Sequence, residues 1–164
     1  MRQELVDIIT FLEATPEAVR FLREGMDAEE LKARADDGTF SFVEHACHLR
    51  DLEREGYGAR IEKILSEELP PLPDFDGTGV ARERRYNEQL FDESMAQFTE
   101  ARTRNASVLK DISDEQLNRR GVLDGFGEIT LEGLVALMRE HDLTHREELR
   151  VLREQILVRR AVER

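Results

Sequence analysis

Two of the four histidines lie four residues apart near the end of the chain, in EHDLTHREEL (140–149). On a helix this spacing puts the His141 and His145 imidazoles on one face, with Cβ atoms about 6 Å apart. Two ring nitrogens so placed can reach one ion at about 2.1 Å each. A lone histidine on an apolar face is commonly a hydrogen-bonded core residue, but two on one buried stripe each need a polar partner. The pair is therefore a candidate part of a metal site.

The other two histidines, His45 and His48, lie three residues apart in EHACHLRDLE (44–53). On a helical wheel His45 falls nearer the centre of the apolar face and His48 nearer its edge. Spacing alone therefore leaves either of them as a third ligand. Cys47, about 100° around the helix from its neighbour, is interpreted as a small core hydrophobe rather than as a ligand or nucleophile.

The segments that must position these residues show helical periodicity, because apolar residues recur at a spacing of three to four. Thr15 is a candidate N-cap with Pro16 at the first helical position, and the pairs Asp27–Glu30 and Ser41–Glu44 match capping boxes. The predicted helices span about 5–12, 16–24, 28–35, 41–67, 80–111 (expected to be the longest), a short turn from 113, and 131–158.

Two connections differ from this pattern. LPPLPDFDGTG (69–79) holds three prolines and two glycines and is long for a bundle connection, so it is expected to cross the end of the bundle or to roof a pocket. GVLDGFGEIT (121–130) reads as irregular with brief extended character. We therefore expect an all-α four-helix bundle with long crossover connections and short extra helices. At 164 residues the chain, residues 1–164, fits a single domain.

Charge and cysteine content exclude several classes of function. With 36 acidic and 24 basic residues the net charge is −12, which repels nucleic acid and anionic membranes. No apolar run approaches the ~18 residues of a membrane span. One cysteine allows no intrachain disulfide, and the N-terminal apolar stretch carries acids, unlike a secretion signal. We expect a cytoplasmic protein that binds neither nucleic acid nor membrane.

Three stretches together resemble the DinB/YfiT-like family of bacterial four-helix metalloproteins: TFSFVEHACHLRDLE (39–53), LPPLP (69–73) and GEITLEGLVALMREHDLTHREEL (127–149). The resemblance runs over about residues 5–155. Matched residue by residue, the family's metal-binding histidines fall on His48, His141 and His145, so the resemblance selects His48 where the wheel left the choice open. Many relatives carry Trp before the serine. Here it is Phe40, which should pack as a hydrophobic anchor.

The resemblance implies a metal-dependent enzyme. Three imidazoles leave a coordination position open for water or substrate. Zn²⁺ or Ni²⁺ suits such a donor set best, and Fe²⁺ or Mn²⁺ also fits. Known relatives include transferases and isomerases that use low-molecular-weight thiols, so we expect a thiol-dependent S-transferase or a hydrolase acting on a small molecule. The alternatives are a non-catalytic, stress-associated metal-binding bundle that acts through protein contacts, for instance as a homodimer, and a purely structural protein.

Supporting residues are harder to assign from sequence. Asp142 follows His141 and is a candidate base or hydrogen-bond partner, with an exposed helix-face acid as the commoner case. Glu44 either orients His48 or only completes the cap with Ser41. By default, Asp51 and Glu53 are expected on the solvated surface, and Arg102 and Asn105 at a rim near water.

Overall fold

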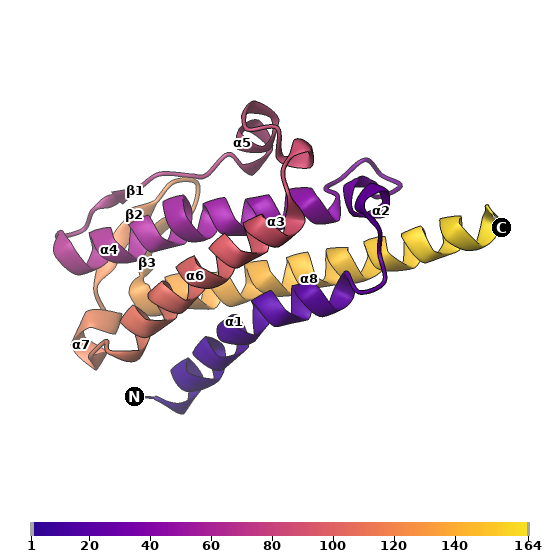
Figure 1. Cartoon of the computed structure of the whole chain (residues 1–164). Coiled ribbons are helices and arrows are strands. Elements are labelled where there is room, and N and C mark those ends of the chain that lie inside the picture. Colours follow the sequence, from indigo (N-terminus) through magenta and orange to yellow (C-terminus); the bar gives the residue numbers. More distant parts are fainter. Residues whose placement is uncertain (1, 164) are drawn as a thin grey trace.

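Four long helical segments run side by side in the computed structural model, which describes residues 2–163 (Figure 1). They are α1, α3 continued by α4, α6 and α8, so the predicted four-helix bundle with extra short helices is confirmed. The elements are α1 Gln3–Leu22, α2 Ala28–Lys32, α3 Phe42–Asp51, the π-helical η1 Leu52–Gly58, α4 Ala59–Ser66, β1 Pro71–Leu72, α5 Gly77–Glu83, the 3-10 turn η2 Tyr86–Glu88, α6 Phe91–Lys110, α7 Asp114–Leu117, β2 Arg120–Leu123, β3 Gly127–Thr130 and α8 Leu131–Val162.

A small sheet lies beside α4, at the end of the bundle that also holds α7 (Figure 1). Strand β2 pairs antiparallel with β3, with Gly121 opposite Ile129, and parallel with β1, with Leu72 opposite Leu123. The sequence predicted only brief extended character here. The long 69–79 connection thus contributes an edge strand before it crosses over α3 as α5.

The two predicted capping boxes are confirmed, and α8 is capped as well. Asp27 with Glu30 and Ser41 with Glu44 form complete capping boxes, and the Thr130 hydroxyl accepts the Gly133 N–H at the start of α8. Each side-chain oxygen satisfies a backbone donor that the first helical turn leaves without a partner. The caps fix where α3 and α8, which carry the histidines, begin.

Helix α1 corrects the prediction of a restart at Pro16, because it continues through this proline from Gln3 to Leu22. Proline lacks an N–H, so the carbonyl of Leu12, one turn earlier, loses its helical donor. Arg102 Nη1 of α6 donates to that oxygen at 2.8 Å instead. Thr15 does not cap the helix; its hydroxyl donates to the Phe11 carbonyl at 3.4 Å.

The helix expected over 80–111 is also corrected. Arg85 adopts a left-handed conformation with φ 50°, which no continuous helix accommodates, and α6 starts only at Phe91. The break lets the Tyr86 side chain turn into the core, where it is fully buried. The longest helix is α8, with 32 residues against 20 in α6.

The predicted 41–67 helix contains a π-helical segment, η1, in its middle. A π turn holds an extra residue and rotates the side chains that follow it, and such turns are frequent at functional sites. Gly58 allows the close packing, because a Cβ there would lie 2.9 Å from the Glu53 carbonyl oxygen and 3.2 Å from the Asn105 side chain. Both Glu53 and Tyr57 of η1 are buried.

The core consists of two apolar clusters with a polar layer between them. One cluster gathers around Leu12, Ile64 and Met138, the other around Phe42, Phe98 and Leu149. Along each long helix, the apolar residues before the polar layer belong to one cluster and those after it to the other. The polar residues between them are Thr15 in α1, His48 and Glu53 in α3 and η1, Arg102 in α6, and His141, Asp142 and His145 in α8. This polar layer, made of those seven residues, is the candidate site.

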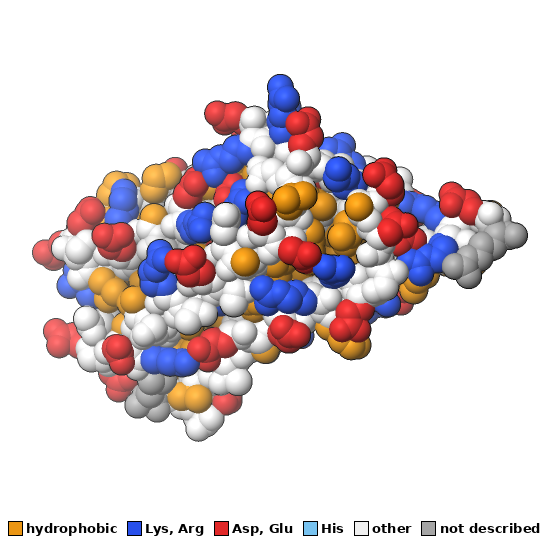
Figure 2. Space-filling model, viewed as in Figure 1, with side chains coloured by type: hydrophobic (Ala, Val, Ile, Leu, Met, Phe, Trp, Pro, Cys, Tyr) orange, Lys and Arg blue, Asp and Glu red, His pale blue; other side chains and the backbone are white. Residues whose placement is uncertain are grey.

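The outer surface carries acidic and basic side chains that alternate over the visible face, with scattered apolar atoms between them (Figure 2). Many of these charges form ion pairs along one helix, such as Arg150 with Glu147 and Glu154. Among residues 2–163, no helix combines the length and apolarity needed to cross a membrane.

Candidate metal centre

Three histidine nitrogens from α3 and α8 converge inside the polar layer. His141 Nε2 lies 3.2 Å from His48 Nε2 and 2.9 Å from His145 Nε2. One ligand atom from each of the three residues lies within 4.8 Å of the others. The structure therefore brings together the three residues, from two distant stretches, that the resemblance to the family selected.

Burial keeps the His48 and His141 imidazoles in the neutral form that binds metals. Burial lowers the pKa of His48 from 6.5 to about 3, and neighbouring His145 and His141 act in the same direction. It also lowers the pKa of His141, although the contact with Asp142 opposes this shift. These two rings therefore offer a lone pair near neutral pH rather than a positive charge.

The donor set fits a divalent ion. Imidazole nitrogens that bind one ion at about 2.1 Å, at tetrahedral or octahedral angles, stand about 3.0 to 3.4 Å apart. Of the two Nε2 distances at His141, 3.2 Å lies within this range and 2.9 Å lies just below it. On the far side of two rings, Nδ1 of His48 and Nδ1 of His141 are buried and have no hydrogen-bond partner in the described part of the chain. Protons on these outer nitrogens leave the Nε2 lone pairs of His48 and His141 available to an ion.

His145 is held from its other side by two residues. Its Nδ1 lies 2.9 Å from Nδ1 of His45 and 3.1 Å from Oε2 of Glu148. A His145 that binds an ion through Nε2 carries its proton on Nδ1, and that proton can be shared by the His45 nitrogen and the Glu148 carboxylate. Burial lowers the pKa of His45 well below 6.5, so it accepts as a neutral ring. His45 thus stands behind His145, on the side away from the three converging nitrogens.

His141 is backed by a buried ionic network, defined here as Arg102, Glu53 and Asp142. The Arg102 guanidinium bonds Asp142 at 2.6 and 3.1 Å and Glu53 at 2.9 Å, and Asn105 adds a 2.9 Å bond to Glu53. Asp142 Oδ1 lies 4.0 Å from His141 Nδ1, a charge contact beyond hydrogen-bond length. Burial alone would raise the pKa of Asp142, but His141 and Arg102 hold it at about 2.

The burial of this network corrects three expectations from the sequence. Asp142 was expected on an exposed helix face, Glu53 on the surface and Arg102 at a wet rim, yet all three are at most 2% exposed. The physical reason is mutual neutralisation: a charge can leave water when opposite charges and hydrogen bonds replace the solvent. Asn105 is half-buried beside them.

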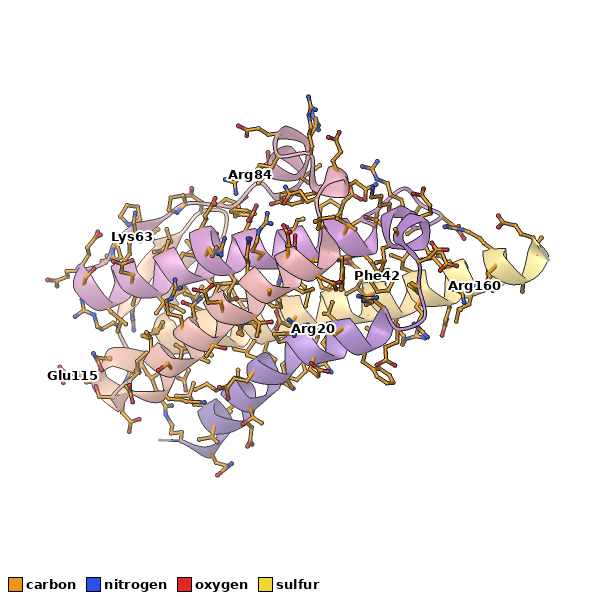
Figure 3. All side chains as sticks on the ribbon, viewed as in Figure 1. Arg20, Phe42, Lys63, Arg84, Glu115 and Arg160 are labelled. Carbon is orange, nitrogen blue, oxygen red and sulfur yellow. The ribbon has the colours of Figure 1, made fainter. Side chains whose placement is uncertain are left out.

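Glu44 and Asp51 are also buried, but they serve other contacts. Glu44 closes the cap with Ser41 and receives Arg34 on both oxygens, so the alternative of an orienting contact to His48 is not realised among the described residues. Asp51 was expected in solvent; it accepts bonds from Arg50, Arg84 and the Tyr86 hydroxyl. Arg84 lies in the crossover above α3 (Figure 3), and its bond to Asp51 attaches the crossover to α3.

His48 is covered by the crossover. The Phe75 ring lies 6.1 Å from the imidazole, and Phe40 packs on it at 5.6 Å, as expected of a hydrophobic anchor. Gly77 approaches so closely that an added Cβ would stand 2.7 Å from Cε1 of His48. Residues 74–78 are called the roof below, and they fulfil the expectation that this connection would roof a pocket.

Two cavities open beside the roof. The Arg82 cavity, about 590 Å³, is lined by Arg82 and Thr78 of α5, by Arg34 and Glu44, and by His145 and Glu148. The Tyr57 cavity, about 340 Å³, is lined by Tyr57, Arg60, Asp74, Asp124, Glu140, His141 and Thr144. Each cavity thus includes one of the three histidines in its wall.

Comparison with known proteins agrees with the family expected from the motifs. The model of the DinB superfamily matches residues 12–149. The chain belongs to the DinB superfamily. Among curated proteins none matches the sequence significantly.

The DinB assignment is accompanied by a close structural likeness. YfiT from Bacillus subtilis superposes with a TM-score of 0.87 and 23% identity, over 95% of this chain and 90% of that one. YfiT is described as "a probable metal-dependent hydrolase with an unusual four-helix bundle topology". At this identity the likeness establishes the shared fold.

Glu148 and the partners of Asp142 were missed by sequence reasoning. Glu148 stands three residues after His145, a spacing that puts it on the same helix face, and this signal was available. Glu53 and Arg102 come from segments that only the fold brings together with Asp142, so no local pattern predicts that these three residues pair.

Proposed function

We propose that His48, His141 and His145 hold one divalent ion and that this DinB protein is a metal-dependent enzyme acting on a small molecule. The close approach of one imidazole nitrogen from each of these three residues carries this proposal. Histidine-only sites with three protein ligands are typical of catalytic rather than structural zinc. An ion bound there would supply Lewis acidity, lowering the pKa of a water or thiol that it binds.

The protein's own residues orient the three histidines and exclude water from them. The ionic network fixes α8 at His141, Glu148 and His45 hold the outer nitrogen of His145, and the roof shields His48. The donor set favours zinc or nickel, with iron and manganese as alternatives. The reaction class we propose is hydrolysis or S-transfer from a low-molecular-weight thiol. Assembly as a homodimer in the cytoplasm stays a prediction.

Metal content measured on protein prepared without a polyhistidine tag tests the proposal. We expect one zinc or nickel per chain, lost in His48→Ala and retained in Cys47→Ala, whose buried thiol lies outside the site. The loaded wild-type protein should then turn over activated esters or a thiol with an electrophile. Protein that binds no divalent ion contradicts the proposal. A tightly bound ion without turnover in either assay favours the non-catalytic alternative instead.

A further inference from the structure

The roof separates two entrances to the candidate metal centre. Its first residue, Asp74, lines the Tyr57 cavity, and its last, Thr78, lines the Arg82 cavity. Between them Phe75 and Gly77 pack on His48. The walls of the two cavities share no residue, and the first contains His141 while the second contains His145. A ligand can therefore approach the three nitrogens on either side of the roof.

The two cavities differ in charge. In the Arg82 cavity, Arg34 and Glu44 neutralise each other and Glu148 contacts His145. Arg82 makes no ion pair or hydrogen bond among the described residues, so its guanidinium is available to a ligand. In the Tyr57 cavity three carboxylates, from Asp74, Asp124 and Glu140, face one guanidinium. The Arg82 cavity is thus lined by two guanidiniums and two carboxylates, whereas the Tyr57 cavity has an excess of two carboxylates. An anion therefore meets less repulsion in the Arg82 cavity, where it can pair with Arg82.

The Tyr57 cavity also offers a hydrogen-bond group for an uncharged ligand. The Tyr57 hydroxyl has no hydrogen-bond partner within residues 2–163, and its ring lies 5.8 Å from that of His141. Burial raises the pKa of Tyr57 to about 12, so the hydroxyl keeps its proton. It can donate to the oxygen or sulfur of a small neutral molecule next to His141.

We propose that the centre receives two reactants by separate routes: an anionic substrate through the Arg82 cavity and a small neutral nucleophile, water or an uncharged thiol, through the Tyr57 cavity. This inference rests on the proposed function, because it assumes an ion held by the three histidines. It adds that the substrate is an anion and that each cavity admits a different reactant.

Co²⁺-loaded protein allows a test without knowledge of the reaction, because its visible spectrum changes when a ligand enters. The probes are azide, an anion, and imidazole at pH 8.5, where it is neutral. Two exposed threonines give matched blocking variants, Thr78→Trp for the Arg82 cavity and Thr144→Trp for the Tyr57 cavity. Arg82→Met and Tyr57→Phe remove the recognition group of each cavity without adding bulk, in case an indole disturbs folding.

We expect Thr78→Trp to weaken azide binding about tenfold, equivalent to about 1.4 kcal/mol, and to leave imidazole binding nearly unchanged. Thr144→Trp should do the reverse, and Arg82→Met and Tyr57→Phe should follow the same pattern with smaller factors. Equal loss of both probes in one variant, no loss in any variant, or no probe binding to the loaded wild-type protein overturns the two-route inference. Failure of the wild-type protein to bind Co²⁺ overturns the proposed function itself.

Discussion

The two sides of the polar layer are built in opposite ways. Behind His141 the three charged groups of the ionic network are buried and paired, with Arg102 bonded to Glu53, Asp142 and the Leu12 carbonyl. Behind His145 the carboxylate of Glu148 is 48% exposed and lines the Arg82 cavity, where Arg82 has no ion-pair partner within residues 2–163. The side of the ionic network, called the closed side, is suited to fix the histidines in place, and the side of Glu148, called the open side, to admit a ligand through the Arg82 cavity.

The closed side also has a charge imbalance. Two carboxylates, Glu53 and Asp142, share one guanidinium, which leaves one excess negative charge in a region from which water is excluded. Such a charge favours a nearby cation, and the neutral histidines lie next to it. The closed side therefore supports metal binding through its charge as well as through its rigidity.

Removal of the guanidinium should have the largest effect. Arg102→Met leaves two buried carboxylates without a counter-charge, and we expect a loss of about 3–5 kcal/mol in the free energy of unfolding. Arg104→Met is the matched control on the same helix, because the exposed Arg104–Glu100 pair contributes at most about 0.5 kcal/mol. Urea unfolding of both variants measures the difference. Equal stabilities would show that the network is not the rigid support described here.

The free energy of unfolding of the metal-free protein should fall on acidification at pH values above those at which carboxylates bind protons. The pKa of His48 falls from 6.5 to about 3 on burial, so between these values the unfolded chain binds a proton that the native chain does not. Stability therefore falls as pH falls from about 6.5, by up to about 1.4 kcal/mol per pH unit for each such histidine. Asp142, with its pKa held at about 2, adds to this loss only below about pH 4.

The measurement is the urea midpoint of metal-free protein between pH 7.5 and 4.5, compared with His48→Asn. We expect the wild-type midpoint to fall with acid and the variant to show a shallower slope. A wild-type midpoint that stays constant down to pH 4.5 would contradict the burial of neutral imidazoles.

On the open side, Glu148→Gln should have a smaller effect, on metal affinity rather than on stability. A carboxylate that accepts the outer N–H of a ligand histidine raises its basicity, and its loss typically costs about 10- to 100-fold in affinity. Glu147→Gln is the control, since Glu147 points to Arg150 on the surface. Competition with a chromophoric chelator measures both. Equal affinities would mean that Glu148 does not support His145.

Sequence patterns predicted the bundle and the three histidines for a clear physical reason. Helical spacing fixes the face of His141 and His145, and the resemblance to the family supplied His48, whose role as a ligand stays a prediction. The closed side was not predicted, because hydrophobic periodicity assigns charged residues such as Asp142 and Arg102 to the surface. Their burial depends on partners from three helices.

Two features of the backbone, the helix that continues through Pro16 and the break at Arg85, were not predicted for a related reason. Pro16 normally starts or breaks a helix, but here the Arg102 side chain takes the place of the missing backbone donor. The break at Arg85 similarly depends on the burial of Tyr86, whose hydroxyl bonds Asp51 at 2.7 Å. In both cases a tertiary contact outweighs the local preference.

X-ray absorption at the zinc edge of protein loaded with one equivalent of zinc counts the imidazoles bound to the ion. We expect three imidazole nitrogens at about 2.0–2.1 Å, completed by an oxygen or nitrogen from solvent, and a loss of imidazole scattering in His48→Ala. A spectrum with fewer than two imidazoles, or with a sulfur at about 2.3 Å, would contradict this expectation.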